Sequence, residues 1–182
     1  MDTLNEALKA YQTLLRKDYC LKLGTVSQEV MQIVFFFLPE HFIHLSGICK
    51  LADLADIANT RSKKNLYQRL MSGDISYMYL QSSSFFSEIN QRLNDLILLP
   101  GLLENLRSGK VIIRFNPAIA GTRINADFLI YKKEIELIYH LFLKEHGGNR
   151  FVPISFFSRS SPKFLMRQTK LRILDVKVVD RS

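Results

Sequence analysis

Cysteine and tryptophan are scarce in this chain of 182 residues, which has two Cys and no Trp. Cys20 and Cys49 stand outside any Cys-x-x-Cys or Cys/His pair, so we expect neither a disulfide framework nor a zinc site. This cysteine usage fits a reducing compartment. The longest apolar run, Ile33 to Pro39, is far shorter than the roughly 20 residues that a membrane-spanning helix needs. We therefore expect a cytoplasmic, soluble protein without a membrane segment.

The familiar catalytic signatures are missing too. The sequence has no glycine-rich phosphate loop, no GxSxG elbow, no HExxH pair and no dinucleotide-binding fingerprint. His41 and His44 lie upstream of Asp53 and Asp56, but this spacing is not specific for a metal, and such histidines are more often hydrogen-bonded structural residues. We expect no metal and no cofactor.

An uneven charge distribution is the most informative feature of the composition. Residues 1–100 contain 10 Lys/Arg and 10 Asp/Glu, whereas residues 101–182 contain 15 and 7, so the whole net charge of +8 lies in the second part. Such asymmetry is typical of proteins that bind nucleic acid or another polyanion. A solvated basic face that keeps the protein soluble is the alternative.

The hydrophobic periodicity changes along the chain and predicts an α+β fold, with a helical N-terminal half packed on a C-terminal antiparallel sheet. We expect a single domain over residues 1–182. Pro100-Gly101 is predicted to end the last long helix, and Ser161-Pro162 to begin a short one. The predicted helices cover an N-terminal segment from Thr3, 46–59, 64–71, a segment from 75, 83–99 and 162–171; the predicted strands cover 18–23, 30–38, 111–115, 128–132, 135–143, 151–157 and an edge strand at 173–179.

Three residues near the helix predicted to start at residue 46 indicate an anion site. His44 precedes this helix, Gly47 removes a side chain from its first turn, and Lys50 lies in or next to that turn. Free backbone N–H groups and the helix dipole favour anions at such a position. A lysine that points to solvent is the alternative.

Basic residues elsewhere follow helical spacing. Arg92 shares a stripe with Phe85, Ile89 and Leu96, where it can extend along apolar surface to solvent or hold a phosphate in a cleft. A predicted helix over 162–171 would align a row of four basic residues behind the strand that carries Ser155, Phe156 and Phe157, an arrangement that suits single-stranded RNA. An amphipathic helix with its leucines inward is the alternative. The row contains Arg159, Lys163, Arg167 and Lys170.

Three segments resemble a family of nucleases associated with phages and mobile elements, within the Barnase–EndoU–Colicin–RelE superfamily of metal-independent ribonucleases. They read FIHLSGICKL, SSSFFSEINQRL and ISFF, and the resemblance covers most of the chain. The matching residues are Phe42, His44, Leu45, Gly47, Lys50 and Leu51, then Ser83, Phe86, Ile89 and Arg92, then Ser155, Phe156 and Phe157.

The resemblance implies cleavage of RNA by transesterification, in which the 2′-OH attacks the adjacent phosphorus and leaves a 2′,3′-cyclic phosphate. His44 is the best acid/base candidate because histidine titrates near neutral pH. Lys50 and Arg92 would stabilise the pentacovalent phosphate, and Ser155 would position it. The implied partners are a structured or tRNA-like RNA and an antitoxin or inhibitor protein. The alternatives are a non-catalytic RNA-binding module and a phage accessory protein that contacts other proteins.

Overall fold

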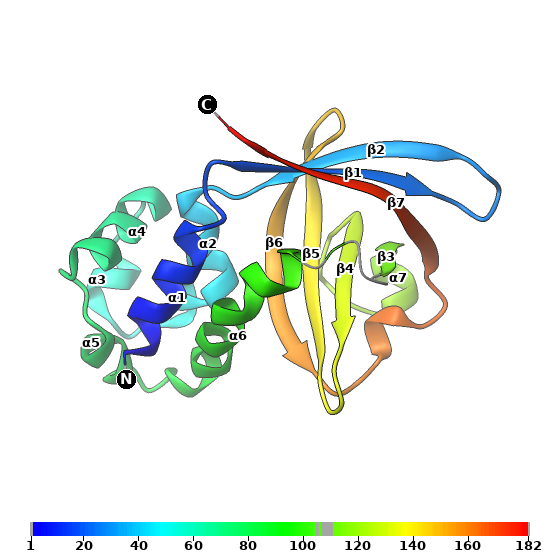
Figure 1. Cartoon of the computed structure of the whole chain (residues 1–182). Helices are drawn as coiled ribbons and strands as arrows, with labels where there is room; N and C mark the ends of the chain where they lie inside the picture. Colours follow the sequence, from blue (N-terminus) through cyan, green and yellow to red (C-terminus); the bar gives the residue numbers. More distant parts are fainter. Residues whose placement is uncertain (1, 105, 107–110, 182) are drawn as a thin grey trace.

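The computed structural model describes residues 2–104, 106 and 111–181, which form a group of helices beside a closed sheet (Figure 1). Residues 1, 105, 107–110 and 182 of the expected domain, among them the basic Arg107 and Lys110, lie outside the described residues. The helices are α1 Thr3–Gln12, α2 Pro39–Ser46, η1 Ile48–Lys50, α3 Ala55–Ala58, α4 Lys63–Ser72, α5 Tyr77–Gln81, α6 Ser87–Glu104, α7 Pro117–Ala120 and η2 Lys163–Leu165. The strands are β1 Lys17–Gly24, β2 Val30–Phe36, β3 Val111–Arg114, β4 Phe128–Lys133, β5 Ile138–Gly147, β6 Arg150–Arg159 and β7 Thr169–Asp180.

The sheet closes into a barrel with the strand order β1-β2-β6-β5-β4-β3-β7. Five strands that follow Gly101 pair in antiparallel fashion, as the change of periodicity predicts. β2 and β6 complete the circle through a parallel contact that joins only Val34 to Arg150 and Phe35 to Phe151. The α+β class is therefore confirmed, and the N-terminal half contributes two strands of its own to the barrel.

β7 lies between β1 and β3 in the barrel order, and the part predicted as an edge strand, 173–179, pairs with β1. The first residues of β7, Thr169 to Arg172, pair with β3, and the residues from Arg172 to Asp180 pair with β1. Its exposed residues Leu174, Val178 and Val179 alternate only loosely with buried ones, which is why the sequence pattern resembles that of a strand at an edge.

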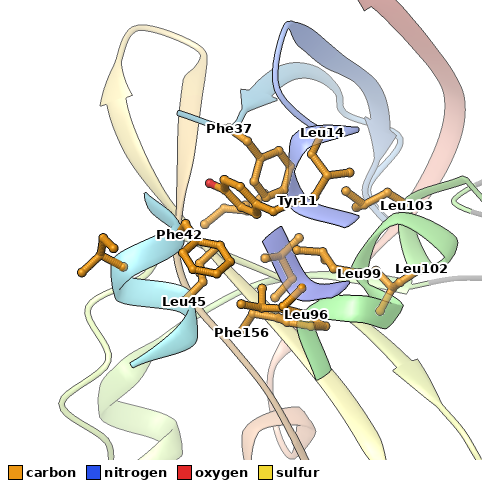
Figure 2. Packing of buried hydrophobic residues seen from close by; sticks show 14 of the residues in the cluster. Tyr11, Leu14, Phe37, Phe42, Leu45, Leu96, Leu99, Leu102, Leu103 and Phe156 are labelled. Atoms are coloured by element: carbon orange, nitrogen blue, oxygen red, sulfur yellow. The ribbon is translucent and has the colours of Figure 1, made fainter. Parts of the chain in front are cut away.

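Helices α1, α2 and α6 meet the inner side of the sheet in one aromatic and leucine-rich core (Figure 2). Tyr11 of α1 packs edge-on against Phe37 and Phe42, with ring centroids 5.8 and 5.3 Å apart. Leu96 of α6 and Phe156 of β6 lie below them in the same core, and both are fully buried. This packing fixes α2 and α6 next to β6, where the candidate site lies.

The prediction of a helix that begins at residue 46 is wrong, because helix α2 ends at Ser46. Pro39 is the first residue of α2, where its missing N–H would have had no helical partner. Gly47 ends α2 in the left-handed conformation, with φ 76°. His44 therefore lies in the last turn of α2 and Lys50 in the short turn η1, so the predicted anion site at a helix N-terminus does not form.

Two further predictions near prolines need correction. α6 continues through Pro100 to Glu104 because burial of Leu99, Leu102 and Leu103 outweighs the lost backbone hydrogen bond. The helix predicted over 162–171 is absent: only η2 forms, after which β7 begins at Thr169. The antiparallel pairing of β7 with β3 prevails there over the local helical spacing.

Candidate functional site

Two arginines share the ring of Phe157 at the end of β6. The Cζ atoms of Arg92, on α6, and Arg159, on β6, lie 5.6 and 5.1 Å from the ring centroid. Burial lowers the pKa of Arg92 from its ordinary value, and the nearby charge of Arg159 acts in the same direction. Within the described part of the chain, no carboxylate lies within 4.0 Å of either guanidinium. Two adjacent cations without a carboxylate partner favour an anionic ligand.

Asp95 fixes α6 to β6 one turn away from Arg92. Its carboxylate accepts hydrogen bonds from the Ser158 backbone N–H at 2.7 Å, from the Ser158 Oγ at 2.9 Å and from Gln91 Nε2 at 2.9 Å. The side chain is 1 % exposed, so these bonds are shielded from water. The anchor holds Arg92 and Phe157 at a fixed separation.

Gly47 lets α6 approach the end of α2 closely. A Cβ atom at this position would lie 3.0 Å from Arg92 Cδ and 3.3 Å from Ile89 Cγ2. The left-handed backbone of Gly47 is also one that other residues rarely adopt. A glycine here is therefore required both by the backbone and by the position of Arg92.

Replacement of Gly47 by Ala is expected to lower the free energy of unfolding by about 1–2 kcal/mol from the left-handed backbone, and by more if Arg92 cannot move aside. Thermal or denaturant unfolding measures this. Gly73→Ala is the matched control, because Gly73 ends α4 with φ 83° but a Cβ atom there would meet nothing within 4 Å. Equal destabilisation of the two variants would contradict close packing against Arg92.

Lys50 lies beside the same stretch of α6 as Arg92. Its Nζ donates to Glu88 Oε2 at 3.1 Å, and both side chains are about half exposed. Glu88 precedes Arg92 by one helical turn, and its charge is felt at the Arg92 guanidinium. An exposed ion pair of this kind is weak, so the ammonium group can exchange Glu88 for a phosphate.

His44 lies one turn before Gly47 and points toward α4. Its Nε2 lies 2.5 Å from Lys63 Nζ. Because an ammonium group only donates, Nε2 accepts this hydrogen bond and the neutral ring carries its proton on Nδ1. Partial burial lowers the pKa of His44, and the Lys63 charge lowers it further. His44 is thus kept neutral, the form that a general base requires.

Ser155 lies two positions before Phe157 on β6, so the two side chains leave the same face of the strand. It is half-buried and pairs across the sheet with Phe142. The serine hydroxyl is thus on the side of β6 on which Arg92 and Arg159 meet Phe157.

The four basic residues predicted as one helical row are spread over three elements. Arg159 is the last residue of β6, and Lys163 donates from η2 to the Gly121 carbonyl at 3.2 Å. Arg167 is a non-glycine residue with φ 58°, and Lys170 lies on β7 opposite Ile113. Of the four, the structure brings Arg159 into contact with the residues around Phe157.

Sequence reasoning missed Lys63 and the packing behind Phe157. His140 is fully buried there, next to Phe157, Phe142 and Phe164, with ring centroids 5.4–6.2 Å apart. Burial lowers the pKa of His140 to about 4, so it stays uncharged beneath the arginines. His140 lies directly opposite Phe157 in the pairing of β5 with β6. The sequence alone does not reveal this register, which is why His140 was not predicted to lie at the site.

Two absences complete the description of the site and chain. Across residues 2–104, 106 and 111–181, no group of three or more His, Cys, Asp or Glu side chains could hold a metal ion. In the same residues, no helix combines the length and apolarity that are needed to cross a membrane.

The site is thus a basic surface backed by aromatic residues, on an α+β fold whose sheet closes into a barrel. A family model, PBECR4, described as phage-Barnase-EndoU-ColicinE5/D-RelE like nuclease4, matches residues 3–172. The chain belongs to this nuclease-like family. A search of curated proteins and a search of solved structures found no match.

Proposed function

We propose that the protein is a metal-independent endoribonuclease and that the surface formed by His44, Lys50, Arg92, Ser155 and Arg159 binds the scissile phosphate. The observation that carries this proposal is the pair of arginines on Phe157, neither of which forms an ion pair within 4.0 Å with a described carboxylate. Membership of a nuclease-like family supports a nucleic acid as the ligand.

The reaction would be an internal transesterification. The 2′-oxygen of the RNA forms a bond to phosphorus, the bond from phosphorus to the 5′-oxygen breaks, and a 2′,3′-cyclic phosphate and a 5′-hydroxyl result. His44 takes the proton of the 2′-OH once Lys63 has been drawn from its Nε2 to the phosphate. A proton must also reach the leaving 5′-oxygen, and Lys63, brought to the phosphate, can donate one.

The developing negative charge on the phosphate oxygens is stabilised by Arg92 and Lys50. A guanidinium offers two parallel N–H donors to two oxygens, which suits a pentacovalent phosphate. Ser155 donates its hydroxyl proton to a third oxygen and fixes the orientation. Lys163, Arg167 and Lys170 bind the phosphates that follow along the strand, so binding weakens as salt is raised.

A toxin-like role in the cytoplasm, held in check by an inhibitor protein, fits a nuclease of this kind. RNA binding without cleavage is the second candidate. The hydrogen bond from Lys63 to His44 Nε2 favours this second candidate. It occupies the lone pair with which His44 would accept a proton from the 2′-OH.

Incubation of the purified protein with total RNA in EDTA tests the proposal. We expect fragments that end in 2′,3′-cyclic phosphate, because no step uses a metal ion. RNA with 2′-O-methyl groups serves as the control, since it lacks the nucleophile and must stay intact. Intact RNA in both reactions, together with salt-sensitive binding, would replace the nuclease by the RNA-binding module.

A further inference from the structure

A second basic cluster surrounds Phe36, at the other end of β6. We name it the Phe36 cluster; it consists of Phe36, His146, Arg150 and Arg181. The guanidinium carbons of Arg150 and Arg181 lie 4.7 and 5.0 Å from the centroid of the Phe36 ring. His146 packs edge-on against the same ring, with centroids 5.9 Å apart. Two cations on one aromatic ring repeat the arrangement at Phe157.

Four separate segments build this cluster. Phe36 is the last residue of β2, directly before α2, and Arg150 is the first residue of β6, opposite Val34. His146 comes from the end of β5, and Arg181 follows β7. The parallel contact between β2 and β6 is only two residue pairs long, and the cluster lies at that junction.

Asp18 is the carboxylate that faces these arginines. Its oxygens lie 3.1 and 3.3 Å from Arg150 Nη2, and Arg181 Nη1 is 3.9 Å away. Arg181 Nη2 donates to the Phe37 carbonyl at 3.1 Å. One carboxylate against two guanidinium groups leaves a net positive charge before His146 is counted. Each guanidinium has five N–H donors, so most of the ten remain for a ligand.

Helix α2 connects the Phe36 cluster to the site at Phe157. His41, in the first turn of α2, feels the charges of His146 and Arg181, and also that of His44 one turn further on. Gly47, at the end of the helix, meets Arg92. α2 thus lies beside β6 (Figure 1), with His41 of its first turn near His146 and Arg181 and with Gly47 at its end against Arg92.

The separation of the two clusters is set by β6. Arg150 and Phe157 are seven residues apart, which corresponds to roughly 23 Å along a strand. A single nucleotide cannot reach both clusters, whereas a single strand of several nucleotides can. Site sizes of about 4–16 nucleotides are ordinary for proteins that track a single strand.

We infer that the Phe36 cluster binds a second phosphate of the same RNA strand, several nucleotides away from the one held at Phe157. The inference rests on the proposed function, since it assumes that RNA occupies the site at Phe157. The ligand class is a single-stranded phosphodiester, with Arg150 and His146, whose side chains are exposed, as its contacts.

Binding of 2′-O-methyl RNA of two lengths tests this inference, because these oligonucleotides bind but cannot be cleaved. The variants are Arg150→Ala and His146→Ala, whose side chains are exposed; Arg181 is left in place because it bonds the backbone at Phe37. By fluorescence anisotropy, each variant should bind a strand of about 12 nucleotides roughly 5–10-fold more weakly. A strand of about 3 nucleotides should bind as tightly as to the parent protein.

Lys9→Ala is the control, since Lys9 is an exposed basic residue of α1 that lies beside Leu70 and Met71 of α4 and belongs to neither basic cluster, and this variant should leave both affinities unchanged. A thermal unfolding curve of Arg150→Ala and Arg150→Gln separates a loss of binding from a loss of folding. Both variants should stay folded, because Asp18 still has Arg181 as an ion-pair partner. Parental affinity of folded Arg150→Ala for the long strand overturns this inference alone. If the parent protein binds neither the long nor the short strand, both the proposed function and this inference are overturned.

Discussion

Replacement of His44 by Ala is expected to lower the rate of RNA cleavage about 100-fold or more, the usual contribution of a general base. Its ring is exposed at the last turn of α2, so the protein should stay folded. Single-turnover cleavage of a labelled RNA measures the effect. His44→Gln is the matched variant: it keeps a hydrogen-bond acceptor for Lys63 but takes up no proton, and it should be as slow as His44→Ala.

The pH dependence gives an independent check on His44. Its pKa lies below the ordinary 6.5, through partial burial first and the Lys63 charge second, so the neutral base persists as pH falls to 6.5 and below. The acid limb of kcat/KM should therefore lie below pH 6.5 in the parent and move to higher pH in Lys63→Ala. A His44→Ala variant that cleaves as fast as the parent would exclude this histidine from the mechanism.

Arg92→Ala should reduce kcat/KM by about 100- to 1000-fold, because a preorganised donor to the transition-state charge is lost. The effect should be larger than that of any single residue among Lys163, Arg167 and Lys170, which contact only neighbouring phosphates in the proposed complex. The same cleavage assay, with RNA concentration varied, separates kcat from KM. A loss in kcat identifies a role in the transition state rather than in binding of the ground state.

Arg92→Lys distinguishes charge from shape at this position. Lysine retains the positive charge but not the planar fork, so we expect an activity between those of Arg92→Ala and the parent. Both variants lose packing on Phe157, and a thermal unfolding curve shows how much stability goes with it. Cleavage by folded Arg92→Ala within about 3-fold of the parent would remove Arg92 from the catalytic group.

Much of the sheet could be predicted from the sequence because its signals are local. The hairpin at Gly147-Gly148-Asn149 and the strands that follow Gly101 are marked by alternation and by turn residues. The closure of the barrel could not be predicted, since it depends on pairing between β1 and β7 at opposite ends of the chain. No local pattern contains that information.

The candidate site shows the same division. Arg92 could be singled out because a charged residue interrupts an apolar stripe. The role of Gly47 was misread, because a glycine after Ser46 can begin a helix or end one, and only the packing of Arg92 against it decides between the two. The Phe36 cluster could not be predicted, since Phe36, the hairpin with His146 and Arg150, and Arg181 are distant from one another in the chain.

The pairing of β1 with β7 has a consequence for the timing of synthesis. β1 is made before β7, and its register with Lys17 opposite Asp180 can form only after the 163 residues from Asp18 to Asp180 have been made. At ordinary elongation rates this delay is on the order of ten seconds. β1 can pair with β2 on its other side before that time, but the barrel closes only when β7 has been made.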